Sequence, residues 1–234
     1  MSQNLQVLIT GFEPFPGAPF NPTQPLVARL LRLRRPALAD VTLSGHIFPV
    51  TYQAVDRELP QLIARHRPQA LLMFGLASRS LHLRVETRAR NAVTMTWPDA
   101  DHAHDRKGSI AGNADAMMFG PHTARLLRAA IATGIDARAS RDAGNYLCNY
   151  LSWRAIEAVR TGRGPRLAAF IHVPLLARDG ASQRRGSQAV TLEQLVGAGE
   201  AVLMELVKLT RMADLAAKAV SRVERSDIRQ SATA

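Results

Sequence analysis

The chain has 234 residues, 47% of them hydrophobic, and a formal net charge of +11. Such a length fits one large α/β domain or two small ones, and the apolar content is enough for a proper core, which excludes disorder over most of the chain. The chain has one cysteine, which excludes an internal disulfide or a thiolate-rich metal site and fits a reducing compartment. No secretory signal is visible, and no segment has the apolar length needed to cross a bilayer. We therefore expect a cytoplasmic protein without a membrane partner.

The excess of basic residues raises nucleic acid as a candidate partner. The basic residues are mostly arginines spread along the whole chain, and aromatic residues make up 5% of it. A surface that binds single strands needs a basic stripe interleaved with stacking rings, and the sequence contains no such stripe. We therefore expect no nucleic-acid partner.

Short apolar runs alternate with segments of helical periodicity. Buried strands are predicted at residues 5–10, 41–50, 70–74 and 167–174, with a short strand between Gly134 and Asp142. Helices are predicted at residues 25–33, 52–65 and 116–132, and the last helix starts at a capping box, residues 191–194. This order predicts an α/β sheet with helices on both faces. Residues 1–212 are expected to form one domain, with a flexible loop at 177–186, and residues 213–234 a helical extension with a tail frayed from Arg225.

The stretch around the single cysteine stands out. Gly144 suits a sharp turn, because glycine adopts backbone conformations that other residues avoid. After it, apolar residues recur at helical spacing at Leu147, Leu151 and Ala155. Cys148 is therefore predicted in the first turn of a helix, where free N–H groups and the helix dipole stabilise a thiolate. The alternative is a small buried hydrophobic residue, which is what most isolated cysteines are.

Two further segments carry candidate site residues. Residues 11–23 form a loop with three of the chain's seven phenylalanines among four prolines and two glycines, directly after the first strand. Ligands bind at that edge of open α/β sheets, so these rings either line a pocket or plug the core. Residues 81–86 alternate strictly, so Arg84 and Glu86 face one side of a predicted strand, either as a solvated surface or as part of a site.

Histidines and carboxylates supply the remaining candidates. His172 lies near the carboxyl end of the last predicted strand, where a single histidine is by default a hydrogen-bonded structural residue. Residues 99–105 contain three aspartates and two histidines, but no regular spacing fixes their geometry, so we expect no functional metal there. Cys148, His172 and Glu86 could together supply a nucleophile, a base and an acid that orients the base. All three are expected at the carboxyl edge of one sheet.

Five motifs resemble the pyroglutamyl peptidase I family, the pyrrolidone-carboxylate peptidases. They are Thr10-Gly-Phe-Glu-Pro-Phe15, Asn21-Pro22, Gly75-Leu-Ala77 followed by Glu86 and Asn91, Asp142-Ala-Gly-Asn-Tyr-Leu-Cys-Asn149, and Phe170-Ile-His-Val-Pro174. They follow the family's order over residues 5–210. The resemblance implies a cysteine exopeptidase that removes an N-terminal pyroglutamyl residue from peptides. It also implies a single-domain three-layer α/β/α sandwich with a mixed, mostly parallel central sheet, no cofactor, and a homo-oligomer, commonly a tetramer and otherwise a dimer.

The resemblance also implies roles by position. Cys148 corresponds to the nucleophile, His172 to the general base and acid, and Glu86 to the residue that orients the histidine, with a thioester intermediate on the cysteine. The alternatives are a diverged member that acts on another lactam or amide, and a non-enzymatic binder of blocked N-termini. A binder has no need of these three residues together, which favours the enzyme.

Substrate-binding residues follow from the same resemblance. Phe12 and Phe15 are similar to the rings that sandwich the flat lactam. Tyr146 and Leu147 correspond to residues that line the pocket beside the nucleophile, and Asn21 to a residue that braces the loop with the rings.

The sequence also departs from the family pattern. Proline replaces the first glycine of the usual Phe-Gly-Gly, at position 16. Ten residues after the glutamate, where the family often has an arginine near the oxyanion, this chain has Thr96. Arg88 and Arg90 are the candidates to replace that arginine. Because the loss of one transition-state donor costs on the order of a hundredfold in rate, catalytic efficiency and exact substrate are the properties in doubt.

Overall fold

The computed structural model describes residues 4–15, 18–103, 107–112, 114–162, 164–176 and 190–231, without the side chains of residues 218 and 220–231. Its elements in chain order are β1 (Leu5–Phe12), α1 (Thr23–Leu31), the 3₁₀ turn η1 (Pro36–Leu38), β2 (Val41–Phe48), α2 (Tyr52–His66), β3 (Ala70–Leu76), β4 (Leu83–Glu86), β5 (Arg88–Arg90), β6 (Ala116–Met118), α3 (His122–Ile131), β7 (Ala137–Ser140), α4 (Leu147–Arg160), β8 (Leu167–Val173) and α5 (Leu192–Ser231).

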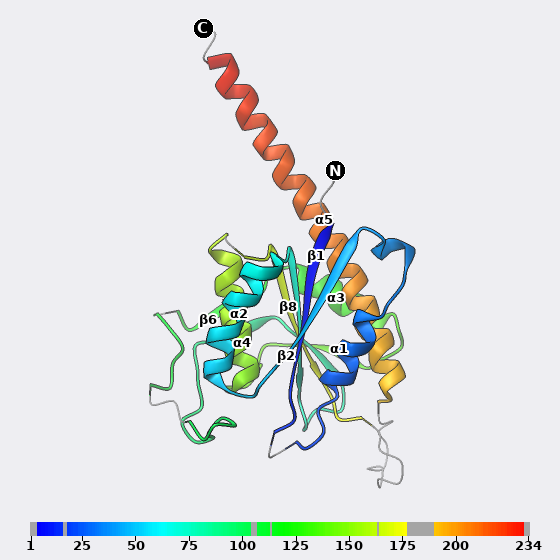
Figure 1. Ribbon diagram of the computed structural model, residues 1–234, viewed down its shortest axis with the longest axis vertical. Coiled ribbons are helices and arrows are strands. Elements are labelled where there is room, and N and C mark those ends of the chain that lie inside the picture. Colours follow the sequence, from blue (N-terminus) through cyan, green and yellow to red (C-terminus); the bar gives the residue numbers. More distant parts are fainter. Residues whose placement is uncertain are drawn as a thin grey trace.

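The central sheet is mixed and mostly parallel. Six strands lie in the order β2-β1-β3-β8-β4-β7, and β5 pairs with β6 in a separate two-stranded sheet. Strands β2, β1, β3 and β8 are parallel, whereas β4 is antiparallel to β8 and parallel to β7. Helices α2 and α4 cover one face of the sheet, and α1, α3 and α5 cover the other (Figure 1). This arrangement confirms the predicted single-domain three-layer α/β/α sandwich.

The strands divide their side chains between two cores. In β1, Val7 and Ile9 pack in the core under α1 and α5, whereas Leu8 and Phe12 pack in the core under α2 and α4. Successive residues of a strand point to opposite faces, so a continuous apolar run is what a strand covered on both faces requires. Each fully buried large apolar side chain contributes about 1.5–3 kcal/mol.

Local signals set the start of α5 and both ends of α2. The predicted capping box is present at the start of α5, because Gln194 N–H donates to Thr191 Oγ1 at 3.1 Å and Thr191 N–H donates to Gln194 Oε1 at 2.9 Å. Helix α2 starts after Thr51, whose Oγ1 accepts from Ala54 N–H at 3.1 Å. It ends at Arg67, which has a left-handed φ of 45°.

Residues 116–132 differ from the prediction of a single helix. Residues 116–118 form β6, and the helix starts at His122. Gly120 between them has a φ of 122°, and Pro121 follows it directly. Because only glycine adopts such a φ easily, the chain turns at this point before the helix begins.

The last helix is longer than predicted. Helix α5 has 40 residues and continues to Ser231, into the segment expected to be frayed, so its end projects from the body (Figure 1). The separation of residues 213–234 from the domain stays a prediction. The predicted loop at residues 177–186 lies outside the described residues. Within the described part of the chain, no helix combines the length and apolarity that crossing a bilayer requires.

Candidate active site

Cys148 lies in the first turn of α4, as the sequence predicted. Gly144 has a φ of 83°, and its N–H donates to Asp142 Oδ1 at 3.0 Å, so the chain turns just before the helix. Tyr146 then enters the helix in an extended conformation, and no side chain of the described residues caps this end. The uncapped N–H groups and the helix dipole therefore favour a negative charge at the start of α4.

The Cys148 thiol rests against strand β3 at a glycine. A Cβ atom at Gly75 would stand 2.7 Å from Cys148 Sγ and 2.6 Å from Phe170 Cζ. Gly75 is the register partner of His172 on the neighbouring strand β8. The missing side chain at Gly75 therefore lets the thiol lie at the level of the histidine.

His172 and Glu86 form a buried pair. His172 Nδ1 lies 2.8 Å from Glu86 Oε1, and the two side chains are 6% and 0% exposed. With Nδ1 taken by the carboxylate, Nε2 is the ring nitrogen left for the thiol. The structure thus brings the three predicted triad residues together.

Opposing effects act on the pKa of His172. Burial by itself would lower it, but the charge of Cys148, a side-chain hydrogen bond with Cys148 and the interactions with Glu86 outweigh burial and raise the pKa from 6.5 to about 9. The imidazole is therefore protonated at neutral pH. An imidazolium beside a thiol can hold a thiolate and can later release its proton.

The prediction that Glu86 lies at the carboxyl edge of the sheet was wrong. In the antiparallel β4–β8 pair Arg84 lies opposite His172 and Val85 opposite Ile171. The carboxyl end of β4 therefore points into the sheet rather than toward the edge where β8 ends. By the same register Glu86 falls opposite Phe170, two residues deeper than His172, and it is fully buried, so it can hold the ring from behind without reaching the surface.

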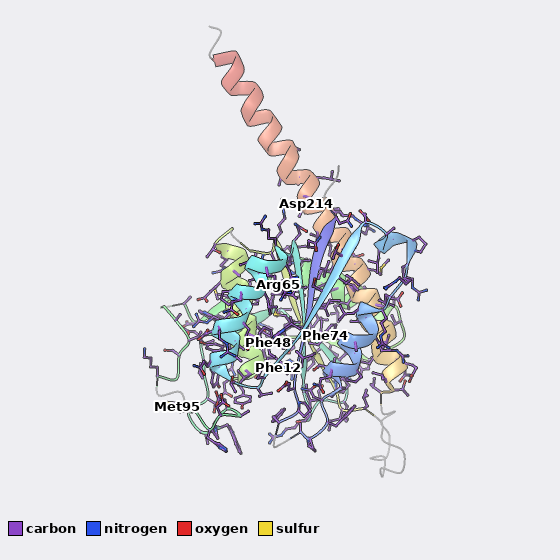
Figure 2. The ribbon with its side chains drawn as sticks, viewed as in Figure 1. Phe12, Phe48, Arg65, Phe74, Met95 and Asp214 are labelled. Carbon is purple, nitrogen blue, oxygen red and sulfur yellow. The ribbon has the colours of Figure 1, made fainter. Side chains whose placement is uncertain are left out.

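The two phenylalanines of the first loop differ in burial. Phe12 is 3% exposed in the core under α2 and α4, with its ring centroid 6.0 Å from that of Phe48 (Figure 2). Phe15 is only partly buried and packs at the edge of the same cluster, as do Tyr146 and Cys148. Phe12 therefore has a packing role, and Phe15 is the one of these two rings that keeps an accessible surface.

Asn21 ties this loop to the start of α1. Its Nδ2 donates to the Glu13 carbonyl at 3.1 Å, and its Oδ1 accepts from Thr23 N–H at 3.1 Å and Thr23 Oγ1 at 2.9 Å. Thr23 Oγ1 also accepts from Phe12 N–H at 3.0 Å. Asn21 thus has the contacts of the bracing residue that the resemblance implied.

Tyr146 and Leu147 flank the nucleophile on its N-terminal side. Leu147 is 1% exposed and packs in the core. Tyr146 Oη donates to the Pro98 carbonyl at 2.9 Å. Burial, followed by the charges of Asp99 and Cys148, raises the pKa of Tyr146 to about 12, so the phenol stays protonated at neutral pH.

Comparison with known proteins decides the family. The profile of the pyroglutamyl peptidase family matches residues 5–208. The chain belongs to this family. Among its relatives, the pyrrolidone-carboxylate peptidase of Thermococcus onnurineus is 30% identical over 205 residues, which are 87% of this chain and 100% of the relative. That of Vibrio vulnificus is 32% identical over 201 residues, which are 85% and 91% of the two chains.

Solved structures agree with the family. The pyrrolidone carboxyl peptidase from Thermococcus litoralis superposes with a TM-score of 0.80 at 27% identity, covering 89% of this chain and 96% of that chain. The pyrrolidone carboxyl peptidase from Fervidobacterium islandicum has a TM-score of 0.78 at 28% identity, covering 87% and 99%.

Sequence reasoning gave no role to Asn149, which follows the nucleophile. Its buried side chain accepts from Arg90 N–H at 2.8 Å and donates to the carbonyls of Arg90 at 2.8 Å and Ala92 at 2.9 Å. These bonds attach β5 to α4 beside Cys148. An asparagine within a predicted amphipathic helix was the available signal, because a buried amide needs partners from another segment.

The arginines considered as replacements for the family arginine contact the loop before Cys148. Arg88 Nε donates to the Arg141 carbonyl at 2.8 Å, and Arg90 Nη2 donates to the Gly144 carbonyl at 3.1 Å. Thr96 itself is exposed. Both arginines therefore have partners on this loop.

Asp99 has a structural role in the segment considered for a metal. Its Oδ1 accepts from the N–H groups of Asp101 at 3.0 Å and Ala103 at 2.9 Å, and its Oδ2 accepts from Tyr52 N–H at 3.2 Å. Among the described residues no group of three or more potential ligands could hold a metal ion. His104 and Asp105 lie outside the described residues.

Proposed function

We propose that this chain is a cysteine exopeptidase that hydrolyses the amide bond after an N-terminal pyroglutamyl residue of a peptide. The single observation that carries the proposal is the contact chain from Glu86 Oε1 to His172 Nδ1, 2.8 Å long, and from His172 to the Cys148 thiol. Membership of the pyroglutamyl peptidase family supplies the substrate class.

The first half of the reaction forms a thioester. Cys148 Sγ, as the thiolate, attacks the pyroglutamyl carbonyl carbon, and the backbone N–H groups at the start of α4 stabilise the oxyanion. The C–N bond then breaks, and His172 gives its proton to the leaving amine. Glu86 keeps the ring oriented and stabilises its charged form.

The second half releases the acid. Water attacks the thioester carbonyl, and neutral His172 takes its proton. The C–S bond then breaks, which frees pyroglutamate and restores the thiolate–imidazolium pair. The cycle needs no redox step and no cofactor.

Recognition of the lactam is assigned to the aromatic loop and the residues before Cys148. Pyroglutamate is small, flat and neutral, so an aromatic face such as Phe15 can cover the ring while polar groups bind its amide edge. Phe12, Tyr146 and Leu147 complete the apolar wall, and Asn21 holds the loop in place. Proline lacks the lactam carbonyl and carries a charge, so it would leave a donor unpaired at a cost of several kcal/mol.

Hydrolysis of a pyroglutamyl-coumarin amide beside its prolyl and alanyl analogues tests this proposal. We expect turnover of the pyroglutamyl compound alone. Cleavage of all three would indicate a general aminopeptidase, and cleavage of none, with a reactive Cys148, would favour the diverged member with another lactam or amide substrate.

The setting of the enzyme is part of the same proposal. A reducing cytoplasm suits a peptidase whose single cysteine must stay unoxidised. Peptides with an N-terminal pyroglutamate are the proposed partners, together with further copies of this chain in a dimer or tetramer. Neither nucleic acid nor a membrane takes part in the proposed activity.

A further inference from the structure

Arg84 lies between the catalytic pair and the loop that leads to the nucleophile. It precedes Glu86 by two residues on β4, so both side chains are on the α4 side of the sheet, opposite the buried Leu83 and Val85. In the pairing of β4 with β8 it is directly opposite His172. Its side chain is 25% exposed.

One nitrogen of Arg84 contacts both the catalytic pair and the loop that leads to Cys148. Its Nη2 forms an ion pair with Glu86 Oε1 at 3.0 Å, the same oxygen that holds His172 Nδ1. The same Nη2 donates to Ser140 Oγ at 2.7 Å and to the carbonyl of Asp142. Residues 140–144, the nucleophile loop, run from the last residue of β7 to the turn before Cys148.

The contact with Arg84 also orients the Glu86 carboxylate. Its second oxygen, Oε2, is buried and has no hydrogen-bond partner among the described residues. The carboxylate is therefore oriented through Oε1, by His172 and Arg84. Without the arginine, His172 alone would hold this fully buried carboxylate, so the angle between the carboxylate and the ring would be less fixed.

We propose that Arg84 is a positioning residue, which fixes the Glu86 carboxylate against His172 and ties this pair to the nucleophile loop. The inference rests on the proposed function. It adds a residue that acts on the triad through Glu86 rather than on the reacting atoms.

The charge of Arg84 also acts on His172. Of the elements packed against β8, α4 presents Cys148, β4 presents Glu86 and Arg84, and β3 presents Gly75, while α5 covers the opposite face. A cation on the Glu86 oxygen weakens the attraction of that carboxylate for the imidazolium. Removing the cation should therefore let His172 hold its proton to higher pH, by about one pH unit, because both cations share Glu86 Oε1.

The test compares Arg84→Met, Arg84→Gln, Arg84→Lys and the control Arg88→Met. Arg88 holds the same loop through the Arg141 carbonyl. Two pH profiles are measured on each full-length variant: kcat/KM for the pyroglutamyl-coumarin amide, and the rate of Cys148 alkylation by iodoacetamide, which needs no peptide substrate.

In Arg84→Met we expect kcat/KM to fall by about tenfold or more, chiefly through kcat, because the triad loses its alignment. Each pH profile should contain a step at the pH where His172 loses its proton. We expect this step to move up by about one pH unit in both profiles. Arg84→Gln, which can keep the loop hydrogen bonds but not the charge, should show the same shift and serves if the methionine variant does not fold. Arg84→Lys should return the step close to its original pH.

An unchanged step in Arg84→Met or Arg84→Gln, or an equal shift in Arg88→Met, would overturn the inference and leave Arg84 as a brace for the loop. The alkylation profile keeps the two proposals separate. If the unmodified enzyme cleaves no pyroglutamyl substrate but the alkylation step shifts as expected, the proposed function fails and the positioning role stands. If the enzyme cleaves the substrate and the step does not move, the positioning role fails.

Discussion

Cys148 is the residue on which the proposed chemistry depends. Replacement by alanine removes the atom that forms the thioester, so we expect activity to fall by at least about a thousandfold, to the level that binding and oxyanion contacts can still supply. Iodoacetamide should modify the unmodified protein once per chain, since the sequence has one cysteine, and abolish turnover. A chelator should have no effect. Normal turnover by Cys148→Ala would rule out the cysteine-peptidase mechanism.

Alanine variants of Phe12 and Phe15 should distinguish a packing role from a role in substrate recognition. Phe12 is 3% exposed, so Phe12→Ala should cost about 3–5 kcal/mol of unfolding free energy whatever its effect on activity. Phe15 is partly buried at the edge of the same cluster, so Phe15→Ala should raise KM for the pyroglutamyl amide with a much smaller loss of stability. Urea unfolding and steady-state kinetics on both variants check this. A Phe15 variant with unchanged KM would remove the ring from the proposed lactam site.

Residue identity was easier to predict from sequence than residue depth. The sequence placed Cys148 in the first turn of a helix, His172 near the end of a strand and Glu86 on the strand face opposite Leu83 and Val85, because strand alternation and helix position are local properties. The depth of Glu86 depends on β4 being antiparallel to β8, a long-range pairing that no local pattern reveals. The shared contact of Arg84 with Glu86 and the nucleophile loop depends on the same pairing.

At the level of elements, the contact between β3 and α4 sets the position of the thiol. In Gly75→Ala the new Cβ would stand 2.7 Å from Cys148 Sγ and 2.6 Å from Phe170 Cζ, closer than atoms can approach. The thiol or α4 must shift, and a displacement of about 1 Å can cost on the order of a hundredfold in rate. We expect a strong loss of kcat and slower alkylation of Cys148.

Gly197→Ala in α5 is the matched control for this change. A Cβ atom there meets nothing within 4 Å, and alanine favours a helix over glycine by about 1 kcal/mol. The control should therefore be slightly more stable and fully active. If Gly75→Ala kept wild-type kcat, the close contact between thiol and β3 would have no part in catalysis.

The sequence predicted elements well where one local signal dominates. The apolar runs of β1, β3 and β8 and the capping box at Thr191 belong to this class. Residues 116–118 were misassigned because a three-residue strand has no period of its own, and its pairing with β5 lies 26 to 30 residues away. Gly120-Pro121 was the signal that could have ended the predicted helix earlier.

At the level of the whole molecule, protonation of His172 couples pH to stability. Its pKa is raised from 6.5 to about 9 on folding, so its contribution is fully present below about pH 6.5 and is lost as the pH rises through about 9. The contribution is on the order of 3 kcal/mol at most, from 1.36 kcal/mol per pH unit. We expect the unfolding free energy, measured by urea titration, to fall over this range.

Two variants isolate this contribution from the other charges of a chain with a net charge of +11. His172→Gln should remove the pH dependence that the unmodified protein shows between pH 6.5 and 9. Cys148→Ser should reduce it, because the charge of Cys148 is the largest effect that raises this pKa. Equal pH dependence in all three proteins would assign the effect to other groups.

The projecting end of α5 allows the division between the domain and its extension to be tested. The family profile ends at residue 208, whereas the helix continues to Ser231. Asp214 lies in this extension, and its Oδ1 forms an ion pair with Arg166 Nε, at the start of β8, at 2.7 Å. A partly exposed pair of this kind contributes up to about 1 kcal/mol, which corresponds to about 2–4 °C in Tm for a chain of this size.

Two truncations separate the ion pair from the rest of the extension. A chain ending at Ala217 keeps Asp214 and should match the full-length protein in Tm and kcat/KM, because it retains the ion pair with Arg166. A chain ending at Met212 loses the ion pair and should show a Tm lower by a few degrees with kcat/KM unchanged, since β8 keeps its sheet partners on both sides. If the chain ending at Met212 loses activity or fails to fold, the extension is part of the domain or of an assembly of several copies. Sedimentation of both truncated chains would distinguish these two cases.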